Sequence, residues 1–441
     1  MSHQSHLLRT QRFLPLFVTQ FLGALNDNVL KNALVVLLTF QAAQWTTLAP
    51  EVLANLAAGI FILPFFLFSA TAGQLADKFD KARLARLVKL LEIAIVLVAG
   101  AGFALHSLAT LMGSLFLLGL HSTLFGPVKY AILPQHLKED ELVGGNALIE
   151  AGTFVAILLG TLLGGLLAGA EGATRVITLA GLGIAIAGYL ASRRIPSAPP
   201  PAPDLALNLN PFSETWRNIR FARENRTVFL SILGISWFWL YGALFLAQFP
   251  AYAKNVLGGG ETAVTLLLAM FTLGIGIGSL LCERLSVGRV EIGLVPLGSI
   301  GLTLFGLDLA FASPAAPYAT EPLGGIGALA LLGMAGSWRL LADLMLIGLF
   351  GGLFIVPLYA LVQQRSSESH RARVIAANNI FNALFMVAGA LAAALLLSAG
   401  LGIPALFGVA AVCNAAVAVY IYGLVPEFRE RFMVWIGRRG G

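Results

Sequence analysis

Long apolar runs follow one another along almost the whole chain of 441 residues. Each run has roughly the 17 to 25 residues that a helix needs to cross the ~30 Å hydrocarbon core of a bilayer. Hydrophobic residues make up 58% of the sequence and charged residues only 11%, which excludes a soluble globular chain. The runs lack the polar and apolar alternation of membrane barrel strands, so we predict an all-α integral membrane protein. The twelve predicted transmembrane helices cover residues 13–38, 52–76, 88–106, 108–133, 144–169, 173–192, 227–252, 261–283, 290–312, 340–362, 375–398 and 402–424.

Basic residues predict the orientation of these helices. Of the 28 Lys and Arg, three (Arg175, Lys254, Arg339) fall in predicted outer loops and two (Lys31, Lys129) inside spans, if both termini are cytoplasmic. The remainder then count as cytoplasmic, as the positive-inside rule requires, including Lys89 at the start of the third predicted span. The net charge of +6 therefore reflects topology, and we expect no nucleic-acid partner. The first run is too long for a cleaved signal peptide, so we interpret it as the first anchor.

A polar break at residues 193–226 divides the chain into two sets of six spans. Its proline run predicts a semi-rigid spacer, and the basic segment after it is expected to lie along the membrane surface. The turn that contains Gly73 is similar to the turn at Gly278, and the segment from Gly145 is similar to that from Ala377. We predict an N-terminal six-helix bundle (1–192), a cytoplasmic linker (193–226) and a C-terminal six-helix bundle (227–441). This duplication resembles the major facilitator superfamily, which places its substrate site between the halves near mid-membrane.

The second half carries an extended periplasmic loop at residues 313–339. Its apolar part, 323–334, is too short and too rich in glycine to span a bilayer. We expect an element at the outer membrane interface, with a re-entrant segment as the alternative. Cys282 and Cys413 predict neither a disulfide nor a metal site, and we expect no cofactor.

The first predicted span is unusually polar. Gln20, Asn26, Asp27, Asn28, Lys31 and Asn32 all lie within it. A charge at the bilayer centre costs at least ~2.5 to 3.5 kcal/mol, so these groups should face a cavity or one another. We expect this face, and Asp27, Asn28 and Lys31 above all, to contact a polar headgroup. The alternative is an Asp27–Lys31 ion pair along one helix face that is only structural.

Lys129 is a second ionisable group inside a span. It follows Pro127, whereas the similar segment around Pro357 in the second half has no lysine. This asymmetry predicts a polar site made by Lys129, its neighbour Tyr130, and Glu150 at similar depth. A structural bridge between Lys129 and Glu150 is the alternative. The polar positions that open the fifth and eleventh spans complete the predicted substrate site: Asn146, Asn378 and Asn382.

Charged turns on the predicted cytoplasmic side form a candidate conformational latch. Its members in the two halves are Gly73, Asp77, Lys78, Lys81, Arg83, Glu283 and Arg284. We expect contacts made in one conformation and broken in another, with Arg365, Arg371 and Arg373 as partners of the first-half turn. The alternative is simple anchoring by positive charge.

Two further features of the spans favour packing over chemistry. The aromatic side of the seventh span, which includes Trp237, Tyr241 and Phe245, is more often packing than a substrate surface. His121 is the one histidine well inside a predicted span, and we interpret it as a packed neutral imidazole rather than a proton relay.

Several motifs together are similar to the bacterial lysophospholipid transporter family of the major facilitator superfamily. They are Phe21–Asn28, the block Pro127-Val-Lys129-Tyr130, the block Asn146-Ala-Leu-Ile-Glu150, and Gly351–Leu358. The resemblance covers nearly the whole chain, and by it Asp27 and Lys129 carry over as headgroup-site residues. A basic residue expected on the seventh span of such transporters is missing between Arg226 and Lys254.

The resemblance implies a flippase of the bacterial inner membrane. Such transporters move lysophosphatidylethanolamine-type lipids from the outer to the inner leaflet by alternating access, where a separate acyltransferase re-acylates them. We therefore expect a non-enzymatic transporter, active as a monomer, with lysophospholipid and membrane lipids as partners. The alternative is a proton-coupled exporter of small amphiphiles in which Asp27 or Glu150 carries the proton. A scaffold or lipid enzyme is disfavoured, because the sequence has no nucleophile constellation or phosphate loop.

Overall fold

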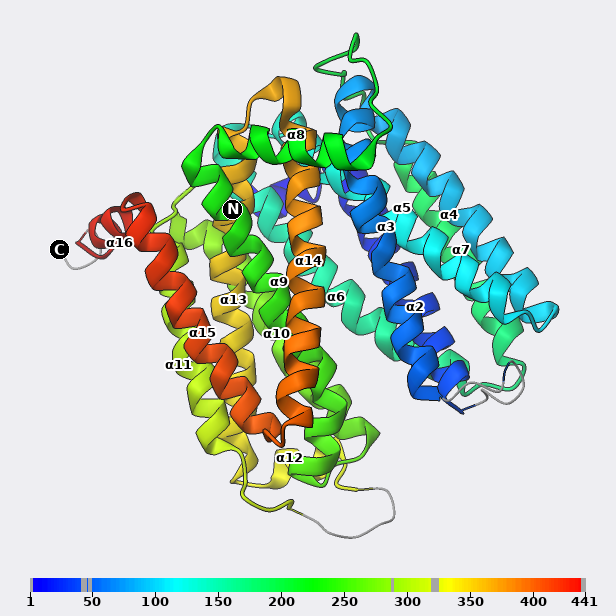
Figure 1. Cartoon of the computed structure of the whole chain (residues 1–441), viewed down its shortest axis with the longest axis vertical. Helices are drawn as coiled ribbons and strands as arrows, with labels where there is room; N and C mark the ends of the chain where they lie inside the picture. Colours follow the sequence, from blue (N-terminus) through cyan, green and yellow to red (C-terminus); the bar gives the residue numbers. More distant parts are fainter. Residues whose placement is uncertain (1–2, 41–45, 47–49, 287–288, 319–324, 438–441) are drawn as a thin grey trace. The chain divides into compact units, whose positions relative to one another are not determined.

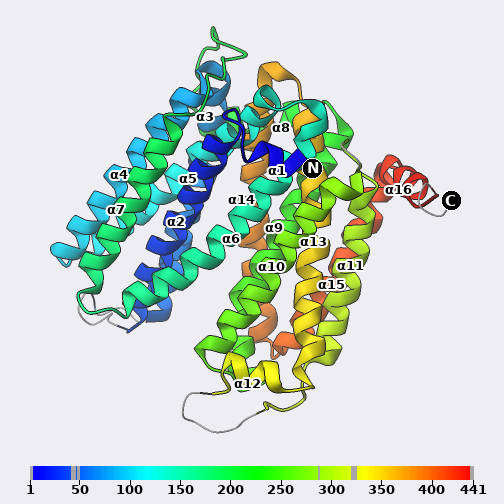
Figure 2. The same cartoon turned by 180° about the vertical axis from the view of Figure 1, so that it is seen from behind.

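The computed structural model describes residues 3–40, 46, 50–286, 289–318 and 325–437. Every regular element in these ranges is helical (Figures 1 and 2), and no strand occurs in them. Twelve helices in the described part are long and apolar enough to cross a membrane. The predicted fold class, an all-α chain with twelve membrane-spanning helices, is thus confirmed.

The chain forms two compact units. The first contains residues 1–145, 155–225 and 363–383, and the second contains residues 146–154, 226–362 and 384–441. The helices up to the linker are α1 (His3–Leu7), α2 (Leu14–Phe40), α3 (Pro50–Lys78), α4 (Lys81–Ala104), α5 (Leu108–His136), η2 (Glu139–Glu141), α6 (Leu142–Ala168), α7 (Ala173–Ser192) and α8 (Pro211–Arg223). Those after it are α9 (Arg226–Tyr252), η3 (Ala253–Leu257), α10 (Glu261–Ser286), α11 (Leu294–Ala312), α12 (Ala328–Gly333), α13 (Ser337–Arg365), η4 (Glu368–His370), α14 (Arg371–Ser398), α15 (Ile403–Leu424) and α16 (Glu427–Gly437).

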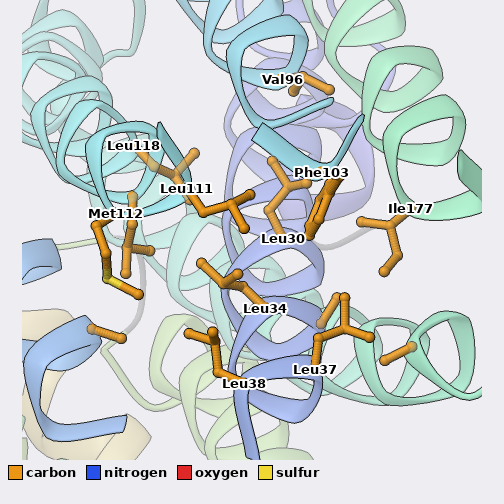
Figure 3. Packing of buried hydrophobic residues seen from close by; sticks show 14 of the residues in the cluster. Leu30, Leu34, Leu37, Leu38, Val96, Phe103, Leu111, Met112, Leu118 and Ile177 are labelled. Atoms are coloured by element: carbon orange, nitrogen blue, oxygen red, sulfur yellow. The ribbon is translucent and has the colours of Figure 1, made fainter. Parts of the chain in front are cut away.

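The apolar core of the first unit lies among α2, α4, α5 and α7. Leu30, Leu34, Leu37 and Leu38 have the spacing of one helix face and project from α2 into this core (Figure 3). Phe103 of α4 and Leu111 of α5 pack against them, as do the other side chains in Figure 3. Close approach of α3 and α5 depends on Gly119, because a Cβ there would overlap the carbonyl oxygen of Phe61.

Stacked aromatic rings fill the core of the second unit. The ring centroids of Phe245 and Phe407 lie 4.3 Å apart with an interplanar angle of 11°, which joins α9 to α15. Tyr241 and Phe249 are also buried, and Tyr241 donates a hydrogen bond to the carbonyl of Leu302. These aromatic residues of the seventh span thus pack inside the unit. The indole nitrogen of Trp237 likewise donates to Asn414 Oδ1 at 2.9 Å.

Helix α4 begins at Lys81, earlier than the predicted start of the third span at residue 88. The reason is a cap, since the Asp80 carboxylate accepts a hydrogen bond from the backbone N–H of Arg83 at 2.8 Å. The charged turn between the second and third spans is therefore short. Asp80 also accepts from Ser197 Oγ at 2.6 Å and from the N–H of Ala198 at 2.9 Å, which ties the linker to this turn.

The linker contacts the end of α3 at further points. Lys78 Nζ donates to the carbonyl of Leu205 at 2.6 Å, and the Gln74 side chain exchanges two hydrogen bonds with the backbone of Asn208. Helix α8, which begins after its cap Asn210, packs on α3. Hydrogen bonds thus hold the linker to the rest of the first unit.

The predicted periplasmic loop contains the short helix α12. Within the expected apolar element, residues 323 and 324 lie outside the described part, as do residues 319–322 before it. Ile326 exchanges backbone hydrogen bonds with Gly258 and Gly260, and the N–H of Ala328 donates to Thr262 Oγ1 at 3.0 Å. The loop therefore packs against the start of α10.

Candidate functional site

The polar face predicted on the first span lies on α2, in the first unit. The Asp27 carboxylate accepts a hydrogen bond from Ser122 on α5, and the Asp27 side chain is 15% exposed. The ammonium of Lys31 lies 5.3 Å from the centre of the Phe61 ring, a cation–π contact. Asn28 donates to the carbonyl of Ala24 in its own helix, and its amide is largely buried. Asp27 and Lys31 are both partly exposed and are therefore more accessible than Asn28.

Behind Asp27 lies a group of ionisable side chains that sequence reasoning does not identify. His121 of α5 has its Nδ1 3.5 Å from Asp27 Oδ1 and its Nε2 3.3 Å from Glu92 Oε2. Glu92 of α4 also forms an ion pair with Lys89 and accepts a hydrogen bond from the Asn26 amide at 2.6 Å. We call Asp27, His121, Glu92 and Lys89 the buried network.

One interpretation drawn from the sequence is wrong at this point, and another is incomplete. The charge distribution assigns Lys89 to the cytoplasmic basic residues, but Lys89 lies inside α4 with a fully buried side chain. His121 is buried, as the expected packed imidazole would be, but its ring also lies between two carboxylates, which the sequence did not indicate. The sequence signal that could have indicated the buried network is the spacing of Lys89 and Glu92, which puts both side chains on one helix face.

Lys129 lies on α5, which is continuous through Pro127 and Pro134. Its ammonium lies 4.7 Å from the centre of the Tyr130 ring, and the Tyr130 side chain is largely buried. Lys129 and Tyr130, two of the predicted site residues, thus contact each other within the first unit.

The remaining predicted site residues fall in both units. Asn378 and Asn382 lie on the part of α14 that belongs to the first unit, and Asn378 is 1% exposed. Asn146 and Glu150 lie on the part of α6 that belongs to the second unit, and both are fully buried. The structural bridge between Lys129 and Glu150 stays a prediction.

The turn at the end of α3 makes a buried ion pair with α14 inside the first unit. Asp77 Oδ2 accepts from Arg373 Nε at 2.9 Å and from the Arg373 N–H at 3.3 Å, while Oδ1 accepts from the Ala372 N–H at 3.1 Å. Arg373 is one of the three partners expected from the sequence. The carboxylate caps the first turn of α14, whose free N–H groups favour an anion.

The other predicted latch residues have varied positions. A Cβ at Gly73 would lie 2.7 Å from that of Ala376, so Gly73 permits α3 and α14 to approach closely. Lys81 is 2% exposed, and Lys78 contacts the linker as described above. Arg83 contributes its backbone N–H to the Asp80 cap. Glu283 and Arg284 lie near the end of α10 in the second unit, and Glu283 is buried.

A second ion pair holds the start of the chain to the rest of the first unit. The Arg12 guanidinium donates to both carboxylate oxygens of Glu141, at 2.6 Å to Oε2, and to the carbonyl of His136 at 3.0 Å. The hydrogen bonds to the Glu141 carboxylate raise the pKa of the Arg12 guanidinium above its ordinary value.

Comparisons with known proteins agree with the motifs. Residues 16–338 match the family model described as Major Facilitator Superfamily. The chain is 28% identical over 387 residues to the lysophospholipid transporter LplT of Enterobacter sp. (strain 638), a match covering 86% of this chain and 87% of that one. It is 29% identical over 427 residues to LplT of Escherichia coli O157:H7 (strain EC4115 / EHEC), covering 92% and 96%. The similarity to bacterial lysophospholipid transporters is thus confirmed.

Solved structures show the same fold at low identity. The human organic anion transporter MFSD10 (TETRAN) matches with a TM-score of 0.68 and 15% identity, over 93% of this chain and 98% of that one. FucP in the outward conformation matches with a TM-score of 0.70 and 12% identity, over 94% and 99%. At such identities the likeness concerns the fold alone.

Proposed function

The chain belongs to the Major Facilitator Superfamily, and from that premise we propose that it transports lysophospholipids across the bacterial inner membrane. The observation that carries the proposal is the similarity to LplT along more than four fifths of both chains. The family and the fold indicate a transporter rather than an enzyme.

The chemistry of the polar face suits this substrate. A lysophospholipid has a phosphate that needs a cation or several donors, and one acyl chain that needs an apolar surface. Lys31 and Lys129 supply cations, and Asp27 supplies an anion for an ammonium group, on two membrane-spanning helices that also carry many apolar side chains. We assign headgroup contact to these three residues, with Asn28, Tyr130, Asn146, Glu150, Asn378 and Asn382 as further members of the site.

The proposed movement is from the outer to the inner leaflet by alternating access, with both termini cytoplasmic. A cytoplasmic-face acyltransferase would then consume the product. The Asp77–Arg373 pair is the proposed latch, because two buried charges on α3 and α14 compensate each other only while the two helices stay in contact. Its breaking and forming would accompany the change between states.

Uptake by spheroplasts tests the assignment of Lys129. We expect Lys129→Ala to abolish uptake of lysophosphatidylethanolamine while the protein stays folded, because the phosphate loses its cation. The matched control is Lys254→Ala, which removes the same charge from an exposed position in η3. Uptake by Lys129→Ala equal to that by the control variant would remove Lys129 from the mechanism.

The same assay separates the proposed flippase from a proton-coupled exporter of amphiphiles. The contact between Asp27 and His121 is the observation that favours this second candidate. Dissipating the pH gradient should leave a downhill flippase active, whereas it should stop the exporter. Uptake of lysolipid that vanishes with the gradient would favour the second candidate.

A further inference from the structure

A groove that shares no residue with the polar face of α2 lies between α3, α4 and α5 of the first unit. Its volume is about 190 Å³, and its lining is apolar. Helix α5 packs against both α3 and α4, whereas α3 and α4 pack little on each other. Helix α5 therefore forms the floor of the groove and the other two helices form its walls. The lining includes Leu75 of α3, Leu84, Leu87 and Leu91 of α4, and Leu124 and Val128 of α5.

The groove has the length and the lining that an acyl chain requires. Leu84 and Leu91 are seven residues apart, which corresponds to about 10 Å along the axis of α4. One leaflet supplies half of the ~30 Å hydrocarbon core. Leu87, Leu90 and Leu97 are exposed on the spanning helix α4, so this side of the helix meets lipid. Since Leu87 also lines the groove, the groove is open toward the bilayer. A chain can therefore enter it sideways and lie parallel to the helices within one leaflet.

One end of the groove lies at the turn between α3 and α4. Leu75 is in the last turn of α3, and Leu84 is in the first turn of α4. Residues 78–86, which form this turn and the start of α4, contain four basic side chains and one acidic side chain, that of Asp80. This end is therefore positively charged. The distribution of basic residues predicts that it faces the cytoplasm, where the surface of the leaflet is anionic.

Arg83 lies beside this end of the groove. It precedes Leu87 by four residues, so the two side chains are neighbours on one face of α4. The Arg83 side chain is exposed. Its backbone N–H donates to Asp80, whereas its guanidinium makes no hydrogen bond or ion pair within the described part of the chain. The guanidinium is thus available to an anion from outside the protein, and its planar donors match a phosphate.

The charges around Arg83 favour a headgroup with a net negative charge. Lys78 and Arg86 donate to backbone carbonyls of the linker, so no carboxylate among the described residues neutralises them. Asp80 already accepts hydrogen bonds from the linker and from the start of α4, so it offers little to an ammonium group. A zwitterionic headgroup would bring an ammonium close to these cations. An anionic headgroup brings only the charge that they attract.

We propose that the groove between α3, α4 and α5 binds an anionic diacyl phospholipid of the cytoplasmic leaflet. One acyl chain occupies the groove, and the phosphate pairs with Arg83. Because the groove is open toward the bilayer, the second chain stays among the surrounding lipids. This phospholipid is a resident ligand and not the transported lipid, so the inference does not rest on the proposed function.

Native mass spectrometry of the full chain tests the headgroup contact. Protein depleted of lipid in detergent is incubated with equal amounts of phosphatidylglycerol and phosphatidylcholine, and the lipid that stays bound is identified by its mass. We expect wild type to retain phosphatidylglycerol in preference. Arg83→Gln should lose about fivefold of that preference, the factor that one basic side chain contributes near an anionic membrane surface.

The matched control for the charge is Arg194→Gln, which removes a basic side chain from an exposed position just after α7. Arg194 precedes Ile195, whose carbonyl accepts from Arg86. Arg86 lies two residues from Leu84, which puts it on nearly the opposite face of α4 from the groove. The control variant should therefore keep the preference of wild type.

Two further variants test the contact with the acyl chain. Leu124→Phe adds bulk to the floor of the groove, so it should lower the retention of both phospholipids. Leu97→Phe is the matched control, because it makes the same change at an exposed position of α4 outside the groove. Leu87→Ala removes an exposed part of one wall, so it should also lower retention, and it keeps the test usable should Leu124→Phe fail to fold.

Several outcomes would overturn the inference. They are equal retention of the two phospholipids by wild type, an unchanged preference in Arg83→Gln, and wild-type retention in both Leu124→Phe and Leu87→Ala. Displacement of the bound phospholipid by lysophosphatidylethanolamine would assign the groove to the substrate instead, and a dimer that forms as lipid is lost would assign it to a second copy of the chain. Lost lysolipid uptake with the phospholipid preference intact would overturn the proposed function alone.

Discussion

Replacing Asp77 by asparagine should open the first turn of α14. The Asp77 carboxylate accepts three hydrogen bonds, from the N–H groups of Ala372 and Arg373 and from Arg373 Nε. A carboxamide at this position would keep the shape but offer one acceptor oxygen and no charge. Arg373, which is 6% exposed, would be left as a buried cation without its anion.

The size of the effect follows from this burial. Removing one partner of a buried ion pair costs about 3–5 kcal/mol, because the other charge stays desolvated. Ala372 and Arg373 lie in the first turn of α14, where N–H groups have no partner within the helix, so their protection comes from Asp77. We therefore expect the Asp77→Asn variant to exchange these two amides faster by roughly two to three and a half orders of magnitude.

Hydrogen–deuterium exchange of a peptide that covers residues 371–376 measures this directly. The matched control is Asp308→Asn, the same chemical change in an ion pair with Arg339 whose side chains are 38% and 62% exposed. An exposed pair contributes about 0–1 kcal/mol, so the control should leave the peptide unchanged. Protection of residues 372 and 373 within about twofold of wild type in Asp77→Asn would refute the reasoning.

Two further predictions concern helix packing and the linker. Gly278→Ala should lower the thermal unfolding temperature, at a cost of about 1–3 kcal/mol or more, because a Cβ there overlaps the carbonyl oxygen of Leu349, whereas Gly276→Ala meets nothing within 4 Å and should not. Burial raises the pKa of Asp80, but hydrogen bonds from Ser197 and from the N–H groups of Arg83 and Ala198 outweigh it and hold that pKa below its ordinary value. The bonds from Asp80 to the linker should thus be intact above about pH 4 and be lost as the pH falls below it. Their loss should appear as faster pepsin cleavage within residues 195–205 below about pH 4 than above it. In Asp80→Asn, which lacks the carboxylate, the two rates should be similar.

The twelve spans could be predicted because hydropathy and length are properties of each segment alone. The candidate partners of Asp77 could also be limited to three arginines from the sequence, because the charged turns of the two halves lie in similar places. The role of the aromatic residues of the seventh span could also be predicted, because such residues usually pack against other helices, and Phe245 does pack in the core.

The buried network could not be predicted in the same way. Its contacts join α2, α4 and α5, so they depend on how each helix is rotated about its axis and shifted along it. The apolar runs specify neither, since they are hydrophobic nearly all round. Lys89 also lies close to the predicted end of a span, where a lysine usually reaches water. The Asp80 cap extends α4 by about two turns and places Lys89 within the helix instead.

The bond between Asp77 and α14 has a consequence for the order of folding. Asp77 leaves the ribosome nearly three hundred residues before Ala372 and Arg373, the residues that supply its donors. Until α14 is synthesised, the Asp77 carboxylate in the first unit therefore lacks the hydrogen-bond donors of Ala372 and Arg373. The N-terminal bundle is finished only by the C-terminal part of the chain, so synthesis of the earlier helices alone leaves it incomplete.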